Sequence, residues 1–79
     1  MLDAVLTGHA IRCIREQKGL SQEVVSGLAG IGRTHLSAIE RGERKPTLET
    51  IFRLAEAMRM KPSELVQAIE SAVEKPCKK

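Results

Sequence analysis

The sequence predicts an all-α domain of five helices, and three observations support this fold class. Apolar residues recur at intervals of three and four along five segments of the 79-residue chain. Glycine or proline marks each boundary between these segments. No stretch alternates apolar and polar residues with the β-branched enrichment that is typical of a strand. We expect a single domain over 1–75 and a flexible basic tail at 76–79.

The first helix is predicted over about 3–18. Asp3 can accept hydrogen bonds from the first free backbone N–H groups. Gly8 lies inside this helix at a cost of about 1 kcal/mol relative to alanine, and Gly19 follows it as a C-terminal stop. Its apolar face consists of Leu6, Ala10, Ile11 and Ile14.

Two short helices are predicted next, over about 22–29 and 33–41. Ser21 can cap the first of them, and Gly32 occupies the cap position of the second. Only residues 30–32 separate the two helices. A turn this short that contains glycine forces a sharp crossing, which is the helix-turn-helix geometry.

The fourth helix is predicted over about 48–58 with Thr47 as its cap, and the fifth over about 62–74 with Pro62 at its favoured first position. The expected apolar stripe of the fourth helix is Leu48, Ile51, Leu54, Ala55 and Met58. The fifth helix carries more apolar side chains than one flank of the core needs, so we expect it to form the interface of a homodimer, although it could instead pack wholly on its own domain. These side chains are Leu65, Val66, Ile69 and Val73.

Composition excludes several classes of protein. A hydrophobic fraction of 42% and a charged fraction of 29% are typical of a globular domain, and no apolar run is long enough to cross a membrane. Cys13 and Cys77 cannot form a disulfide scaffold, which favours the cytoplasm. An enzyme is not expected, because so short a chain leaves little to build a pocket that excludes water.

No cofactor, metal ion or small-molecule ligand is predicted. His9 and Cys13 lie four residues apart on one helix face, but two ligands are too few to hold zinc. Phe52 is the only aromatic residue, which argues against binding single-stranded nucleic acid by base stacking. The net charge of +3, with its excess of basic residues in the first half of the chain, permits phosphate binding.

Residues 20–42 resemble the helix-turn-helix of the phage repressor/Cro-like, or Xre-type, family. The segments that are similar to the family's other helices are 11–15, 18–22, 46–51, 54–55 and 61–65. The small controller proteins of bacterial restriction–modification systems look most similar, although His35 stands where some of them have an aromatic residue. The resemblance implies a five-helix lambda-repressor-like domain and a sequence-specific transcriptional regulator that binds double-stranded DNA as a homodimer.

The third helix is the expected recognition helix. It is about 13 Å long, which suits a major groove about 12 Å wide. Arg33 is the strongest candidate to read a base, because a guanidinium can bond guanine O6 and N7 together. Thr34, Ser37 and Ala38 are the other candidates, with Ala38 limited to apolar contact. The alternative for Arg33 is a phosphate contact or a solvated side chain.

Five residues are candidates for phosphate contacts. Gln22 opens the second helix, where an amide and free N–H groups suit a phosphate oxygen, and the family resemblance implies the same role. The others are Arg41, Arg44 and Lys45 after the recognition helix and His35 at its flank. The alternatives are that Gln22 only fills a first helical turn and that the basic residues only solubilise a loop.

Two further expectations come from the family resemblance. Arg15 and Glu40 match a pair that often forms a buried ion pair in the family, so we assign them to structure and not to DNA contact. Arg59 stands where the family often has glycine, so we predict a left-handed backbone there at a cost of about 1–2 kcal/mol.

A homodimer would place two recognition helices about 34–36 Å apart, so the operator should be roughly palindromic. An antitoxin or phage-type repressor of the same fold is an alternative function. A protein-interaction module that binds no DNA is another, but it would lack readers such as Arg33 and Thr34 on its third helix. No membrane partner is expected.

Overall fold

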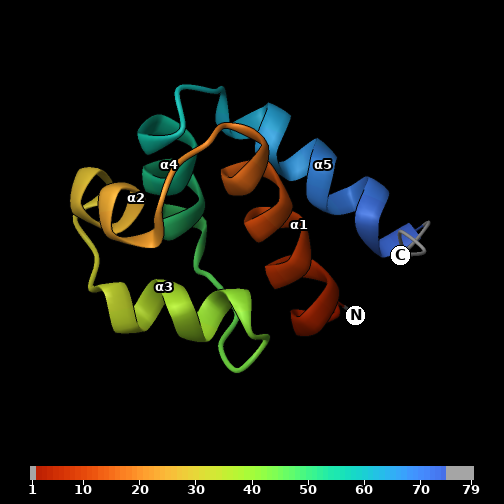
Figure 1. The fold of residues 1–79 in the computed structure, drawn as a ribbon. Coiled ribbons are helices and arrows are strands. Elements are labelled where there is room, and N and C mark those ends of the chain that lie inside the picture. The colour runs from red at the N-terminus through yellow and green to blue at the C-terminus, as the bar shows by residue number, and fades with distance from the viewer. Residues whose placement is uncertain (1, 75–79) are drawn as a thin grey trace.

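A computed structural model describes residues 2–74 of the chain, and the tail expected at 76–79 and Cys77 lie outside these residues. The described part folds into five helices (Figure 1). They are α1 (Ala4–Gln17), α2 (Gln22–Ala29), α3 (Arg33–Glu40), α4 (Leu48–Ala57) and α5 (Pro62–Glu74). Residues 2–74 contain no strand. Each helix begins and ends within one residue of its prediction, so the all-α fold class is confirmed.

The helices form one bundle in which α3 and α5 lie on opposite sides (Figure 1). The helix α1 packs against both α3 and α5, whereas α4 packs against α2 and α5. Because α3 contacts only α1 and α2 among these main packing pairs, its outer side remains uncovered. No helix within the described part of the chain is long and apolar enough to span a membrane.

Local sequence signals explain where the helices begin. The carboxylate of Asp3 and the hydroxyls of Ser21 and Thr47 accept hydrogen bonds of 2.9–3.1 Å from backbone N–H groups in the first turns of α1, α2 and α4. Gly32 has no side chain to offer, so α3 begins without a side-chain cap. Arg59 has a φ of 58°, which confirms the predicted left-handed backbone between α4 and α5.

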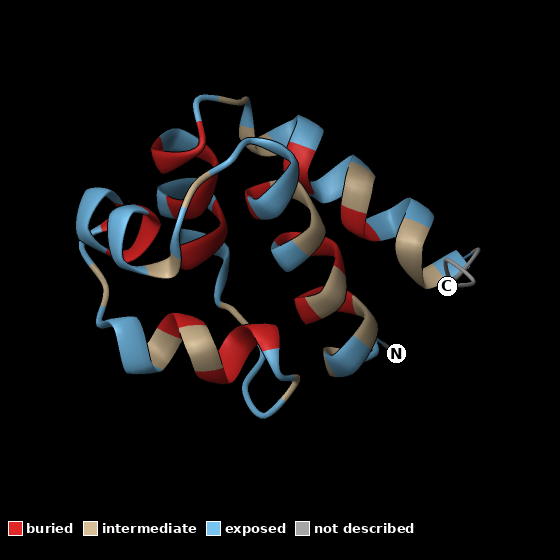
Figure 2. Cartoon of the chain, viewed as in Figure 1, coloured by how far each residue is buried: buried red, intermediate tan, exposed pale blue. Residues whose placement is uncertain are grey.

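A single apolar core receives side chains from every helix, and the buried residues face inward (Figure 2). Its largest fully buried apolar side chains are Ile11, Val25, Leu36, Ile39, Leu54, Met58 and Leu65. The expectation that Leu48 belongs to this core is wrong, because its side chain is 70% exposed at the first position of α4. Burial of Leu36 and Ile39 fixes which side of α3 faces the solvent.

Gly8 permits an unusually close approach between α1 and the end of α3. A Cβ atom at this position would lie 2.1 Å from the carbonyl oxygen of Ile39 and 2.9 Å from that of Glu40. The helix-propensity cost expected for a glycine inside α1 describes the isolated helix and leaves out the contact between α1 and α3. In the folded domain, glycine is the residue that allows the backbones of α1 and α3 to meet.

We predict that Gly8→Ala lowers the free energy of unfolding by about 1–3 kcal/mol, because the added methyl group forces the two backbones apart. Urea denaturation followed by circular dichroism at 222 nm measures the change. Gly27→Ala is the matched control, since a Cβ atom there meets nothing within 4 Å and α2 gains helix propensity. A Gly8→Ala variant as stable as Gly27→Ala would contradict the close approach.

Candidate nucleic-acid interface

A buried ion pair joins α1 to the last residue of α3. The Nε atom of Arg15 donates to Oε2 of Glu40 at 2.7 Å, and its Nη2 donates to Oε1 at 3.0 Å. The two side chains are only 11% and 3% exposed. The hydrogen bond with Glu40 raises the pKa of Arg15, so the guanidinium remains charged at neutral pH. The structure therefore contains the ion pair that the family resemblance implied.

The same network extends to the beginning of α2. The remaining Nη1 of Arg15 donates to the carbonyl oxygen of Leu20 at 2.8 Å, just before the cap of α2. The Nε2 of Gln22 donates to Oε1 of Glu40 at 2.9 Å. The sequence predicts a phosphate contact for Gln22 and carries no signal for its bond to Glu40. An amide nitrogen carries two hydrogens, so one N–H of Gln22 is left for another acceptor.

A hollow of about 450 Å³ lies between the first turn of α2 and the outer side of α3. The residues that line it are Gln22, Arg33, Thr34, Ser37 and Arg41. It brings together three residues predicted to read bases and two predicted to contact phosphate. Arg33 and Thr34 are exposed at its rim, and Ser37 is half-buried. We define these five residues as the reading surface.

One predicted base reader does not belong to this surface. Ala38 is only 8% exposed. Each residue of an α-helix is rotated by about 100° from the one before it, so Ala38 does not line the hollow although its neighbour Ser37 does. Ala38 therefore offers little surface to a base, and its predicted base contact stays a prediction. His35 is half-buried and does not line the hollow.

Arg41 is engaged with two neighbouring groups after the end of α3. Its Nε and Nη2 atoms donate to the two carboxylate oxygens of Glu43 at 2.9 and 3.0 Å, and its Nη1 donates to Oγ of Ser37. The hydrogen bonds from Arg41 lower the pKa of the Glu43 carboxyl, so this pair is ionised at neutral pH. Arg44 and Lys45 are exposed and form no ion pair with any residue in 2–74.

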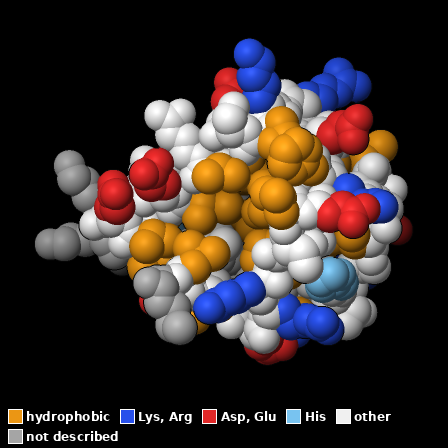
Figure 3. Space-filling model, turned by 180° about the vertical axis from the view of Figure 1, so that it is seen from behind, with side chains coloured by type: hydrophobic (Ala, Val, Ile, Leu, Met, Phe, Trp, Pro, Cys, Tyr) orange, Lys and Arg blue, Asp and Glu red, His pale blue; other side chains and the backbone are white. Residues whose placement is uncertain are grey.

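The expected dimer residues fall into two groups. Leu65 and Ile69 are buried in the core of their own domain, so the prediction that they form an interface is wrong. Val66 is exposed and Val73 is half-buried. These two side chains belong to a patch that we define as the α4–α5 face, where hydrophobic side chains gather on the side turned away from Figure 1 (Figure 3). Its members are Phe52, Pro62, Val66 and Val73.

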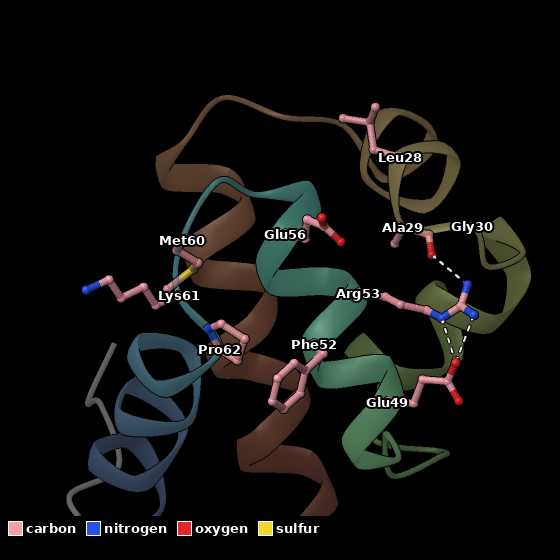
Figure 4. A pocket seen from close by; sticks show the side chains of 10 residues that line it. All are labelled: Leu28, Ala29, Gly30, Glu49, Phe52, Arg53, Glu56, Met60, Lys61 and Pro62. Carbon is pink, nitrogen blue, oxygen red and sulfur yellow. Dashed lines mark hydrogen bonds and ion pairs between the residues drawn. The ribbon is translucent and has the colours of Figure 1, made fainter.

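A second hollow, of about 790 Å³, lies between the C-terminal end of α2 and the outer side of α4 (Figure 4). Arg53 crosses it, with Nη2 2.9 Å from Oε2 of Glu49 and Nη1 3.5 Å from the carbonyl oxygen of Ala29. The contact with Ala29 joins α4 to the last residue of α2. Phe52 lines this hollow and also belongs to the α4–α5 face.

Residues 2–74 hold no cluster of three or more His, Cys, Asp or Glu side chains that could bind a metal ion. Within this range, the Nε2 of His9 lies 3.4 Å from Sγ of Cys13 on α1. This contact satisfies two half-buried side chains and adds nothing to the reading surface.

Comparison with known proteins places the chain among helix-turn-helix proteins. Residues 11–65 match a protein family described as Helix-turn-helix. An uncharacterized HTH-type transcriptional regulator of Sinorhizobium fredii is 41% identical over 61 residues, which cover 77% of this chain and 79% of that protein. The control protein C.BamHI of Bacillus amyloliquefaciens is 35% identical over 63 residues, which cover 78% of each chain.

One solved structure combines sequence identity with the same fold. The restriction–modification controller protein C.AhdI of Aeromonas hydrophila is 40% identical and superposes with a TM-score of 0.76. The match covers 82% of this chain and 98% of C.AhdI.

We predict that Glu40→Gln lowers the free energy of unfolding by about 3–5 kcal/mol, because it leaves the charge of Arg15 buried without its partner. Urea denaturation of the variant measures this loss. The matched control is Glu16→Gln, which breaks the exposed pair with Arg12 and should leave the midpoint unchanged. Equal midpoints for the two variants would show that the Arg15–Glu40 pair carries no special constraint.

Proposed function

The chain belongs to the helix-turn-helix family, and we propose that it is a transcriptional regulator that recognises a specific double-stranded DNA sequence as a homodimer. The observation that carries this function is the reading surface. Most of its basic and polar side chains lie on the uncovered side of α3, while Leu36 and Ile39 bury the opposite side of the same helix. The family is one of DNA-binding regulators and not of enzymes.

The dimensions of α3 suit insertion into DNA. Eight residues give a helix about 12 Å long, which matches a major groove of about 12 Å. The N-terminal residues of a recognition helix meet base edges. Arg33 and Thr34 occupy these positions and are exposed. In this arrangement, Arg33 would bond a guanine, whereas Thr34 and Ser37 would contact neighbouring base edges.

The flanking residues would hold the DNA backbone. Gln22 lies at the N-terminus of α2, where its free amide hydrogen and the first N–H groups of the helix can bond a phosphate oxygen. Arg41, Arg44 and Lys45 lie beyond the other end of α3, and His35 lies at its flank. Such contacts supply affinity and fix register, whereas the base contacts supply sequence preference.

Dimerisation would use the α4–α5 face. Phe52 and Val66 are about half exposed, and both line a hollow that Pro62 borders. Exposed apolar patches of this kind mark interaction sites. This face lies on α4 and α5, whereas the reading surface lies on α2 and α3, so both can be occupied together. Two copies would present two α3 helices to a roughly palindromic operator.

The similarity to C.AhdI and C.BamHI supports a role like that of controller proteins. We place this activity in the bacterial cytoplasm, where a transcriptional regulator meets its DNA. No cofactor, membrane partner or small-molecule ligand is part of the proposal.

We predict that Arg33→Ala weakens binding to the operator by roughly 5- to 150-fold, the discrimination of one bidentate base contact, and weakens binding to random sequence much less. Titration of end-labelled duplexes, with the promoter of its own gene as the operator, measures both affinities. Arg44→Ala is the comparison variant, because a phosphate contact should weaken both duplexes evenly and reduce the salt slope by about one. An equal loss on both duplexes for Arg33→Ala would reassign Arg33 to phosphate.

We also predict that Val66→Glu shifts the protein from dimer to monomer, because it places a carboxylate within the apolar α4–α5 face. Sedimentation velocity with interference optics measures the shift. Val24→Glu on α2 is a close match, since the exposed fractions are 46% for Val66 and 45% for Val24, and this variant should remain a dimer. A dimer that survives Val66→Glu, or a wild-type monomer, would contradict the proposed interface.

A further inference from the structure

Arg41 is already bound to an anion in the free protein. The two carboxylate oxygens of Glu43 face Nε and Nη2 of Arg41 at 2.9 and 3.0 Å. This is the parallel, two-bond arrangement in which a guanidinium also binds phosphate. Glu43 therefore occupies the edge of the guanidinium that a DNA phosphate would need. The third interaction, from Nη1 to Oγ of Ser37, places the same side chain across the reading surface.

The turn after α3 creates this arrangement. Residues two positions apart do not face each other along a continuing helix. Here α3 ends at Glu40, Gly42 has a φ of 79°, and the backbone N–H of Glu43 donates to the carbonyl oxygen of Ala38 at 2.9 Å. The chain thus folds back over the last turn of α3. This return brings the carboxylate of Glu43 alongside the guanidinium of Arg41.

The Arg41–Glu43 pair is exposed to solvent, so another anion can reach Arg41, and the pair contributes little to folding stability. The side chain of Arg41 is 52% exposed and that of Glu43 is 59% exposed. Exposed ion pairs contribute little to folding stability, because water screens them and both side chains lose freedom. The hydrogen bonds of this pair nevertheless occupy two N–H groups of Arg41, and Ser37 takes a third. A competing polyanion can displace Glu43 without disturbing the core.

We propose that Glu43 is an internal stand-in for a DNA phosphate. In the free protein it holds Arg41 across Ser37, and a phosphate of bound DNA takes its place. The exchange turns Arg41 toward the DNA backbone and leaves the hydroxyl of Ser37 open to the groove. Glu43 thereby reduces the affinity for DNA in general and makes the availability of Ser37 depend on a phosphate contact. This inference rests on the proposed DNA-binding function.

The test measures binding to a mixed-sequence 24-base-pair duplex, because a phosphate contact does not depend on sequence. Glu43→Gln should bind about two- to fivefold more tightly than wild type at 0.1 M salt, which is the range that an exposed ion pair represents. Arg41→Gln should bind more weakly and show a salt slope smaller by about 0.9 for each bound chain. In the Arg41→Gln background, Glu43→Gln should lose most of its gain.

A second carboxylate provides the charge-matched control. Glu23 lines a separate hollow of about 340 Å³ that also touches Gln22 and Arg33, and within residues 2–74 its side chain forms no ion pair. Glu23→Gln changes the net charge by the same amount but frees no arginine. Its effect should be smaller than that of Glu43→Gln and the same with or without Arg41. An equal gain from both variants, or a Glu43→Gln gain that persists without Arg41, would overturn the inference.

A direct observation of Arg41 covers the case in which a variant does not fold. In ¹⁵N spectra of wild-type protein, the Nε–H signal of Arg41 should shift when the 24-base-pair duplex is added. An unmoved signal on saturated protein would overturn the exchange while leaving DNA binding intact. Failure of wild type to bind the duplex at low salt would instead reject the proposed function, and the inference with it.

Discussion

The buried pair of Arg15 and Glu40 is the constraint on which the rest of the structure depends. It bonds α1 to the end of α3, and its outer hydrogen bonds reach Leu20 and Gln22 at the beginning of α2. One carboxylate therefore holds three elements in a fixed relation. A buried ion pair gains little net stability over an apolar packing of the same volume. Its value in this domain is geometric, because it sets the position of α3 relative to α2.

The reading surface follows from that relation. The inner side of α3 is buried in the core, and the close contact at Gly8 brings α1 against the C-terminal end of α3. The residues that remain outside form a hollow whose other wall is the first turn of α2. The reading surface is thus formed by side chains that the core does not use. Gln22 belongs to both the ion-pair network and the reading surface, since one amide hydrogen bonds Glu40 and the other is left for another acceptor.

Much of the fold could be predicted from the sequence because its signals are local. Capping residues, glycines and helical periodicity act within a few residues of each other. Each predicted helix boundary therefore lies within one residue of the observed boundary. Periodicity also predicts which side of a helix is apolar, but not what covers that side. For this reason Leu65 and Ile69 proved to be core residues, whereas Leu48 proved to be exposed.

The site could be predicted only in part, because the partner of a polar side chain depends on tertiary geometry. The sequence predicts the basic and polar character of α3, and the family resemblance predicts the Arg15–Glu40 pair. The bonds from Gln22 to Glu40 and from Arg41 to Glu43 and Ser37 arise from how the chain turns between helices. No spacing rule predicts them.

The most direct test of the proposed function is sedimentation of wild-type protein with labelled duplex from its own promoter, at two salt concentrations. A dimeric, sequence-specific regulator should form a saturable complex of two chains per duplex that weakens steeply with salt and survives competitor DNA. No complex at low salt would contradict the proposed function and would favour a protein-interaction module.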